Sequence, residues 1–337
     1  MTDTPILPGL SRRRMLAGLA AAPALSAMAA PASAGSAAGF GEEQVKAALE
    51  SATGTTLVLL GTGGGPRPGR TRRMTSHVMV TKGAAYVLDC GLGVTDQYAR
   101  AGLHFGAIRS IFITHHHPDH NIEYGPLLVI GWVNGLKQPV RAYGPPPLKQ
   151  MTEDFLRAYR TTIGFWAEDF KMAPLSAVEV TEVPGAGPVM QDDNVKVTAA
   201  LVQHPPVTPA LAYRFDFHDR SIAFSGDTTP LDTVAQLAKG ADVLVHEAMY
   251  TKGLEDYLKF SIAKGFAANL DAYMAHMRAD HSPVEDVGRI AAEAGVKTLV
   301  LSHLVPAIDS ISDDTWRAMA AKSFKGEIIV AHDMMAV

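Results

Sequence analysis

The feature that most constrains the fold of this chain is a recurring pattern: a short apolar segment followed directly by histidine or an acidic residue. Short β-branched segments of this kind are typical of buried strands. In layered α/β folds the strand ends form one edge, so side chains that follow different strands converge there. In chain order, the residues in these positions are His115, His117, Asp119, His120, His204, Asp227, His246, Glu247 and His303.

The densest part of the pattern is residues 110–121, where an apolar strand ends in H-x-H-x-D-H. Imidazole nitrogens and carboxylate oxygens are the ligands that zinc prefers when no thiolate is present. The run is rich enough in ligands for two metal ions, with His115 and His117 facing one ion and Asp119 and His120 facing the other. A purification tag is disfavoured because the run is internal, and isolated structural histidines do not have this spacing.

Length and composition are those of a globular α/β protein. The chain has 337 residues, 47% of them hydrophobic, and a single α/β domain of about 280 residues is admissible. No apolar run after residue 40 is long enough to cross a bilayer. Cys90 is the only cysteine, which rules out an intrachain disulfide and disfavours thiolate ligation of a metal.

The N-terminal residues resemble an export signal. Residues 11–16 read S-R-R-R-M-L, like a twin-arginine motif, and an Ala/Leu-rich stretch and an A-S-A site at residues 32–34 follow. We therefore expect a twin-arginine-type signal peptide over residues 1–34, a linker over 35–55 and a hydrolase domain over 56–337. This order predicts a periplasmic protein; the alternative is a basic N-terminal arm.

The charge balance argues against a polyanionic partner. The whole chain carries a formal net charge of −4, and the signal segment contains three arginines and one aspartate. The mature chain is therefore more negative still, whereas a nucleic-acid-binding surface needs positive charge. We expect no nucleic acid and no membrane partner after signal removal, although a local positive patch stays open.

Periodicity predicts a helix before residue 55 and alternating strands and helices after it. Expected strands are 56–60, 76–80, 84–89, 110–114, 195–203, 211–217, 221–224, 242–245, 298–302 and 327–331; expected helices are 42–51, 122–134, 148–163, 231–238 and 283–294. Residues 249–280 interrupt the alternation as two helices. Their aromatic residues and methionines are typical of core packing, and a lid or a homodimer contact is the alternative role. Residues 61–66 predict a tight backbone turn close to the site, because prolines follow where a nucleotide-binding helix would begin.

Taken together, these motifs resemble the metallo-β-lactamase superfamily. The shared features are H-x-H-x-D-H, a later lone histidine, S-G-D-T at residues 225–228 and a last strand-end histidine. Gly61-Thr62-Gly63, Asp89-Cys90-Gly91, His246-Glu247-Ala248 and His281-Ser282 resemble more narrowly its ribonuclease Z-like and arylsulfatase/phosphodiesterase-like branch. The resemblance covers residues 56–337 and implies an αββα four-layer sandwich, two mixed β-sheets flanked by helices.

The resemblance also implies two bound zinc ions. His115, His117 and His204 would bind one ion, Asp119, His120 and His303 the other, and Asp227 both. Mn²⁺ or Fe²⁺ is compatible with the same ligands. The residues expected to be catalytic are His281, Glu247, Asp119 and Asp227.

Within that set, the resemblance implies that His281 faces the substrate oxyanion and that Glu247 orients it. The alternative for His281 is that it merely precedes a helix N-cap. We expect His116 to point away from the metals, His246 to be structural, and Asp89 to hold a ligand histidine through its second ring nitrogen.

The expected function is that of an exported dinuclear zinc hydrolase that cleaves small phosphodiester or aryl sulfate esters by attack of a metal-bridging hydroxide. The expected partner is therefore a small-molecule ester. Export, negative charge and the lack of a Gly/Pro-rich tRNA-gripping arm disfavour tRNA processing. The alternatives are a lactonase or another C–O or C–N hydrolase of the same fold, and a non-catalytic metal-binding protein.

Overall fold

The computed structural model describes residues 41–68, 71–137, 139–175, 178–265 and 269–337. The predicted signal segment, residues 1–34, lies outside the described residues. The boundaries of the linker and hydrolase domain stay predictions. No helix among the described residues is long and apolar enough to cross a membrane.

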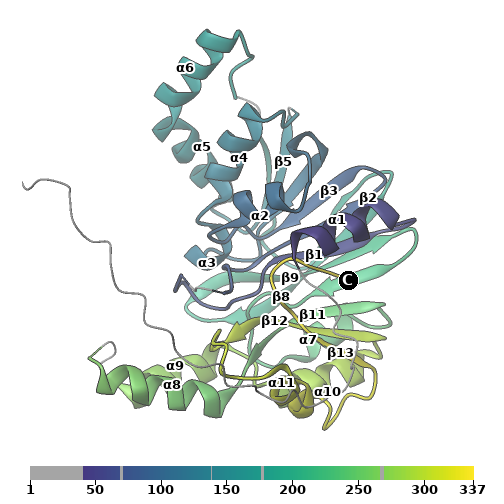
Figure 1. The fold of residues 1–337 in the computed structure, drawn as a ribbon, viewed down its shortest axis with the longest axis vertical. Helices are drawn as coiled ribbons and strands as arrows, with labels where there is room; N and C mark the ends of the chain where they lie inside the picture. The colour runs from purple at the N-terminus through teal and green to yellow at the C-terminus, as the bar shows by residue number, and fades with distance from the viewer. Residues whose placement is uncertain (1–40, 69–70, 138, 176–177, 266–268) are drawn as a thin grey trace, which may run out of the picture. The chain divides into compact units, whose positions relative to one another are not determined.

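Two mixed β-sheets stand at the centre of residues 41–337 (Figure 1). The first sheet consists of β14 (Met335–Ala336), β1 (Thr56–Gly61), β2 (Ser76–Thr81), β3 (Ala84–Leu88), β4 (Ile108–Phe112), β5 (Val140–Gly144) and β6 (Val178–Glu182), in that spatial order. The second consists of β13 (Glu327–Val330), β12 (Thr298–Val305), β11 (Val243–Met249), β10 (Ser221–Phe224), β9 (Val207–Phe217), β8 (Val195–His204) and β7 (Gly187–Gln191).

Helices cover the outer face of each sheet. The first sheet is covered by α1 (Glu42–Ser51), α2 (Val94–Arg100), α4 (Tyr124–Val133), α5 (Leu148–Ala158) and α6 (Arg160–Phe170), and the second by α7 (Asp232–Leu237), α10 (Val284–Ala294) and α11 (Asp313–Ala320). The remaining helices are the 3₁₀ helix η1 (Phe105–Ala107), the short α3 (Pro118–Asn121) and the pair α8 (Thr251–Ala263) and α9 (Leu270–Asp280). The predicted αββα four-layer sandwich is confirmed.

The apolar core follows from strand alternation. Along β1, Leu57 and Leu59 face the second sheet while Val58 and Leu60 face the helices, and all four are fully buried. Between the sheets, aromatic rings from both sides interlock, with the Phe112 ring centroid 5.0 Å from that of Phe215 in an edge-to-face arrangement. Because both faces of each sheet are covered, the central strands read as continuous apolar runs, which is why the sequence identifies them.

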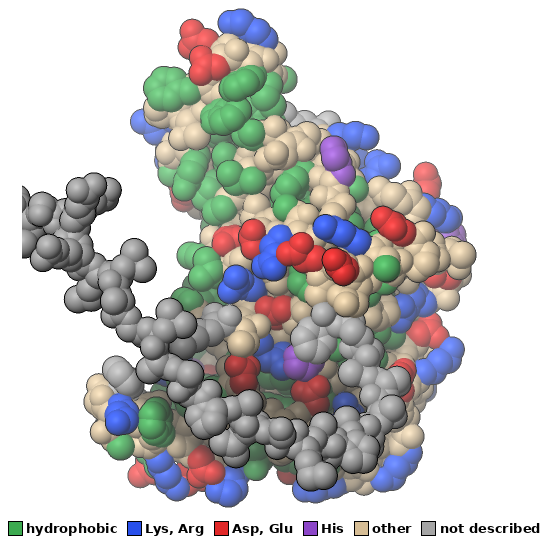
Figure 2. Space-filling view, viewed as in Figure 1, with side chains coloured by type: hydrophobic (Ala, Val, Ile, Leu, Met, Phe, Trp, Pro, Cys, Tyr) green, Lys and Arg blue, Asp and Glu red, His purple; other side chains and the backbone are tan. Residues whose placement is uncertain are grey.

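The largest error in the expected elements concerns residues 148–170. We predicted one helix over 148–163, but the chain forms α5, turns at Tyr159 (φ −95°, ψ 6°) and continues through Gly164 as α6. Hydrophobic side chains gather on the surface of these two helices (Figure 2), where Phe165 is 64% and Phe170 61% exposed. In the sequence, Gly164 and the aromatic residues after it predict the end of a helix, whereas in the structure they lie within α6.

Smaller differences concern short elements that the sequence does not predict and the ends of two predicted strands. Several elements have no expected counterpart: the strands β5, β6, β7 and β14 and the helices α2, α3 and α11. All of them are short, and β6 and β7 are also half exposed. The strands β11 and β12 run further than expected, so His246, Glu247 and His303 lie within strands and not after them. The two helices expected over residues 249–280 are confirmed as α8 and α9.

The close packing of α10 on α11 gives a test of the helical layer. A Cβ on Gly288 of α10 would lie 2.3 Å from the Ala320 carbonyl oxygen, whereas a Cβ on Gly164 of α6 would meet nothing within 4 Å. We expect Gly288→Ala to lower the free energy of unfolding by about 1–3 kcal/mol. The matched substitution Gly164→Ala should raise it by about 1 kcal/mol through helix propensity. Urea denaturation measures both, and equal effects of the two substitutions would contradict the described packing.

Candidate metal centre

Three histidines from two separate strand ends form the first group of the site. His115 and His117 follow β4, and His204 is the last residue of β8. The His117 Nδ1 atom lies 3.2 Å from His115 Nε2 and 2.9 Å from His204 Nε2. These three nitrogens therefore face a common point.

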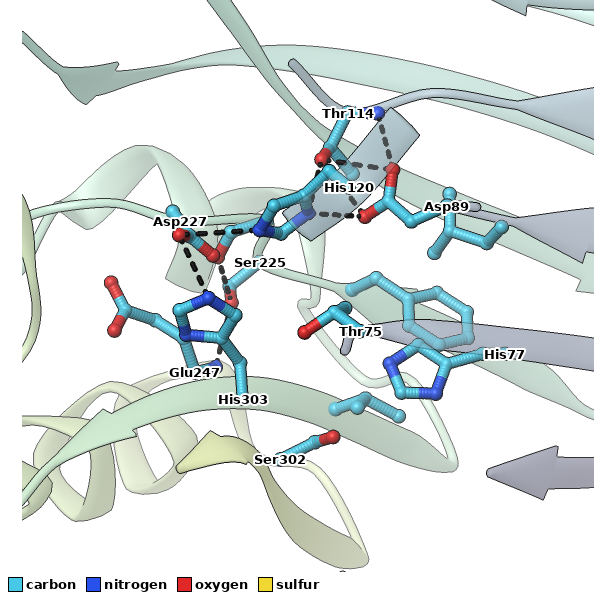
Figure 3. Close-up of a pocket in the computed structure, with 14 residues that line it drawn as sticks. Thr75, His77, Asp89, Thr114, His120, Ser225, Asp227, Glu247, Ser302 and His303 are labelled. Atoms are coloured by element: carbon cyan, nitrogen blue, oxygen red, sulfur yellow. Dashed lines mark hydrogen bonds and ion pairs between the residues drawn. The ribbon is translucent and has the colours of Figure 1, made fainter. Parts of the chain in front are cut away.

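The second group combines two carboxylates and two histidines. Asp119 and His120 lie in α3, Asp227 follows β10, and His303 lies in β12. The His303 Nε2 atom is 3.3 Å from Asp119 Oδ2 and 3.0 Å from Asp227 Oδ2. Figure 3 shows Asp227 between the rings of His120 and His303. All four side chains are buried.

A local irregularity aims His303 into this group. Its φ is +44°, and the pairing of β11 with β12 shifts register there, as in a β-bulge. The glycine turn makes room for the ring, because a Cβ on Gly64 would lie 2.7 Å from His303 Nδ1. The same turn donates the Gly65 N–H to Asp119 Oδ2 at 2.9 Å. The expectation of a turn passing close to the site is confirmed.

The Asp227 carboxylate joins the two groups. Its Oδ2 atom lies 3.0 Å from His303 and 3.3 Å from His120 in the second group, and 4.0 Å from His115 and 3.9 Å from His204 in the first. One oxygen atom is thus within reach of donor atoms from both groups. This is the arrangement that a carboxylate shared by two metal ions requires.

The donor atoms fit a pair of metal ions. Bonds of about 2.0–2.1 Å at a tetrahedral centre place neighbouring ligand atoms about 3.3 Å apart, close to the separations within both groups. His120 Nε2 and Asp227 Oδ1 are buried and have no hydrogen-bond partner in the described part of the chain. Buried polar atoms are normally paired, so these atoms are suited to a metal. The clustered residues form a dinuclear metal site.

The electrostatics of the second group favour a cation. Burial alone would lower the pKa of His303, but the Asp227 and Asp119 carboxylates outweigh burial and raise it to about 10. The first group behaves differently: burial and the neighbouring His120 lower the pKa of His115 well below its usual value, which keeps its nitrogens available as ligands. The carboxylates therefore create a negative potential in the second group, next to the His115 imidazole, whose pKa is lowered.

Ligand orientation is fixed by contacts behind the site. The Asp89 carboxylate lies 2.8 Å from His120 Nδ1 and accepts the Thr114 N–H at 2.8 Å, so the predicted contact between Asp89 and a histidine of the H-x-H-x-D-H motif is confirmed. His204 Nδ1 donates to the Asp280 carbonyl at 3.0 Å. In both rings Nδ1 is occupied, which leaves Nε2 for the site.

His281 and Glu247 form a hydrogen-bonded pair next to these groups. His281 Nδ1 lies 3.0 Å from Glu247 Oε2, and Glu247 Oε1 accepts the Thr228 N–H at 2.8 Å. Burial opposes charge on His281, but the Glu247 carboxylate and its hydrogen bond outweigh burial and raise the pKa of His281. The imidazole therefore has a fixed orientation and holds its proton more tightly than a free histidine.

The other histidines near the site have structural contacts. His116 Nε2 lies 2.8 Å from the Pro145 carbonyl, so the ring points away as expected. His246 is fully buried, with Nδ1 2.8 Å from the Glu247 carbonyl. Sequence reasoning missed His77, which stacks on Phe224 at 5.5 Å and whose pKa burial lowers to about 3. Its position near the start of β2, before further apolar strand residues, carries no signal of a site.

A cavity of about 470 Å³ opens next to the two groups. Its walls come from the glycine turn, the helices α8 and α9, and the segment after β12. His117, His204, Asp119, Asp227 and His281 all line it. The fold and the site together define a metal-dependent hydrolase of the metallo-β-lactamase class, with its buried ligands at the floor of the cavity.

Comparison with known proteins agrees with this assignment to the metallo-β-lactamase class. The family model of the beta-lactamase superfamily domain matches residues 85–304. Ribonuclease Z of Mycobacterium bovis is 34% identical over 286 residues, which cover 83% of this chain and 97% of the relative. Ribonuclease Z of Mycobacterium marinum is 32% identical over 289 residues, with the same shares covered. The chain belongs to the beta-lactamase superfamily and, within it, to the ribonuclease Z-like branch.

Solved structures support the fold. The metallo-beta-lactamase fold protein YhfI of Bacillus subtilis matches with a TM-score of 0.61 at 18% identity, and the match covers 84% of this chain and 98% of YhfI. The short form of human tRNase Z has a TM-score of 0.59 at 23% identity, again with 84% and 98% covered. Both are similar to this chain in fold.

These relatives correct the predicted function. The expectation of a small phosphodiester or aryl sulfate ester as substrate, and of no nucleic-acid partner, is wrong, because relatives matched over nearly their full length are ribonucleases. The arylsulfatase part of the resemblance is wrong for the same reason. The charge argument failed because net charge averages over the whole surface, whereas Arg67, Arg72 and Arg73 gather at one cavity.

The predicted export and periplasmic location are overturned by the same relatives. Relatives named Ribonuclease Z match over 97% of their own length, and they do not indicate an exported hydrolase of small esters. The prediction rested on three arginines followed by apolar residues, and an N-terminal segment of another kind can have the same composition.

The contact between Asp89 and His120 gives a test of the site. We expect Asp89→Asn to weaken metal binding about 10–100-fold. Asparagine tolerates the left-handed backbone at this position, where φ is +58°, but it offers His120 an N–H where the carboxylate accepts one. Metal content after dialysis against a graded chelator measures the loss. His116→Ala is the matched control and should retain full metal content, while loss of metal in both variants would contradict the assignment.

Proposed function

We propose that this chain is a dinuclear zinc endonuclease that hydrolyses a phosphodiester bond in tRNA precursors. The observation that carries the proposal is that six potential metal ligands surround a seventh, Asp227. The chain that holds them is similar to ribonucleases Z over almost the whole length of those relatives. Two structural neighbours, a human tRNase Z and a long-form RNase Z from yeast, have names that are in keeping with an RNA substrate.

The proposed ligand assignment follows the two groups. His115, His117 and His204 would hold one ion, Asp119, His120 and His303 would hold the other, and Asp227 would contact both. Nitrogen and carboxylate ligands without thiolates suit zinc, and manganese or iron would be accepted in the same positions. When bound, two such ions would lower the pKa of a water molecule and stabilise negative charge on the attacking and leaving oxygens.

The proposed role of His281 is proton transfer to the leaving oxygen. Its Nδ1 is occupied by Glu247, which leaves Nε2 for the cavity that the residue lines. A protonated imidazole can stabilise negative charge on a phosphoryl oxygen or donate its proton as the bond breaks. Glu247, held by the Thr228 N–H, would keep the ring in this orientation and keep it charged.

The charge of the cavity supports an anionic substrate. Apart from Asp119 and Asp227, which would be neutralised by metal, the described residues that line it include no carboxylate. The arginines Arg67, Arg72 and Arg73 line its wall. Arg72 donates to Thr62 and to the Ala331 carbonyl, whereas Arg67 is exposed and donates only to Tyr257 Oη among the described residues. We therefore expect Arg67 and Arg73 to be the arginines that contact phosphate groups.

Removal of the His281 imidazole should separate catalysis from metal binding. We expect His281→Ala to lower kcat by about 10²–10⁴-fold, with two metal equivalents retained. The readouts are single-turnover cleavage of a precursor tRNA and metal analysis of the same sample. Loss of metal in this variant would show that His281 acts on the metal site and not on the substrate.

The pH profile tests the role of Glu247. Because Glu247 raises the pKa of His281, the protonated ring persists to higher pH than it would alone. In Glu247→Gln that contribution is lost, so the alkaline limb of kcat/KM should move to lower pH. An unchanged alkaline limb in this variant would count against His281 as the proton donor.

The proposed function itself is tested with a precursor tRNA transcript. Zinc-loaded protein should cut it at one position, chelation should stop cleavage, and added zinc should restore it. Asp227→Asn should abolish cleavage, whereas His116→Ala should cleave as the wild type does. Failure of the metal-loaded protein to cut any precursor tRNA would overturn the proposal.

A further inference from the structure

The size of the active cavity restricts the form in which RNA can enter it. At about 470 Å³ it falls in the range of about 300–1,000 Å³ typical of pockets that enclose a small molecule. An RNA duplex has its bases stacked inside and its phosphates outside, so it is too wide to enter. A single unstacked nucleotide is of the right scale.

Two tyrosines form the wall that such a nucleotide would meet. Tyr257 lies in α8 and Tyr273 in α9, and both line the cavity and are half-buried. Buried apolar residues of the same helices, among them Leu254, Met274 and Met277, anchor the wall against Met249 and Val305 at the ends of β11 and β12. The tyrosine rings are thus carried on a supported surface beside the metal ligands.

Positive charge lies directly against this aromatic wall. Arg67 Nη1 donates to Tyr257 Oη at 3.3 Å, which links the segment after the glycine turn to α8. Arg73, half-buried, lines the cavity as well. Aromatic rings for the bases combined with basic groups for the phosphates are the means by which proteins bind single-stranded nucleic acid.

We propose that Tyr257 and Tyr273 stack on the base of one unpaired nucleotide adjacent to the scissile phosphate, and that Arg67 contacts the phosphate of that nucleotide. The helices α8 and α9 would thereby make the site specific for single-stranded RNA. This inference rests on the proposed RNA substrate and adds the form of RNA that the cavity accepts and the residues that select it.

The simpler role for these tyrosines is packing alone, and α8 itself provides a control for it. Phe260 lies one turn from Tyr257, is 59% exposed and does not line the cavity. Replacement of an aromatic ring on the outer face of α8 should therefore leave nucleotide binding unaffected. Only rings on the cavity wall should matter to a bound base.

The test is fluorescence anisotropy with metal-loaded full-length protein and three labelled probes. The first is a single-stranded RNA oligonucleotide with non-hydrolysable methylenephosphonate linkages, the second has the same backbone with abasic residues, and the third is a paired duplex. Wild type should bind the first probe about tenfold more tightly than the second, as expected for stacking of a base, and should bind the duplex weakly. The Phe260→Leu control should keep the tenfold ratio.

Substitution of both tyrosines separates stacking from packing. Tyr257→Leu with Tyr273→Leu should bring the ratio between base-bearing and abasic probes close to one, whereas Tyr257→Phe with Tyr273→Phe should preserve it because the rings remain. A ratio that survives the leucine substitutions, or a wild type that does not distinguish the probes, overturns the inference. Cleavage of precursor tRNA without base discrimination would refute this inference alone; base-dependent binding without cleavage would support it and refute the proposed endonuclease.

Discussion

The structure is organised around one buried carboxylate. Asp227 has its Oδ2 atom within 4.0 Å of histidines from both ligand groups, and its side chain is almost fully buried. An isolated buried charge is strongly unfavourable, so such a group must be compensated by cations or hydrogen bonds. Here the compensation comes from histidines on both sides, and in the loaded protein it would come from metal. Loss of this carboxylate would leave two histidine clusters with no shared ligand.

The fold supplies the positions that this constraint requires. The proposed ligands come from the segment after β4 that includes α3, the end of β8, the loop after β10 and the bulge in β12. These strands belong to two different sheets, so the site exists only when both sheets are packed together. Asp89 and the Asp280 carbonyl each hold a ligand histidine by its Nδ1 atom. The second of these contacts comes from the end of α9. The helix α9, which lines the cavity, therefore also orients His204, one of the proposed metal ligands.

Much of this architecture could be predicted from the sequence, and the errors have physical causes. The central strands and H-x-H-x-D-H were recognisable because buried strands have continuous apolar runs and the ligands follow them without a gap. The contact of Asp89 with a histidine followed from its place at a strand end.

By contrast, β6 and β7 are half exposed and gain their stability from pairing with neighbours, which no local pattern reveals. The substrate class was wrong because a net charge of −4 conceals arginines that only folding brings to one wall, and His77 was missed because burial within β2 leaves no mark in the sequence.

The central claim is that one carboxylate is shared by two metal ions at the floor of an RNA-cleaving cavity. Anomalous X-ray diffraction from crystals of the zinc-loaded protein, recorded on both sides of the zinc absorption edge, tests it most directly. The account predicts two anomalous peaks, one among His115, His117 and His204 and one among Asp119, His120 and His303, with the Asp227 carboxylate contacting both. A single peak, or two peaks of which one lies away from Asp227, would contradict it.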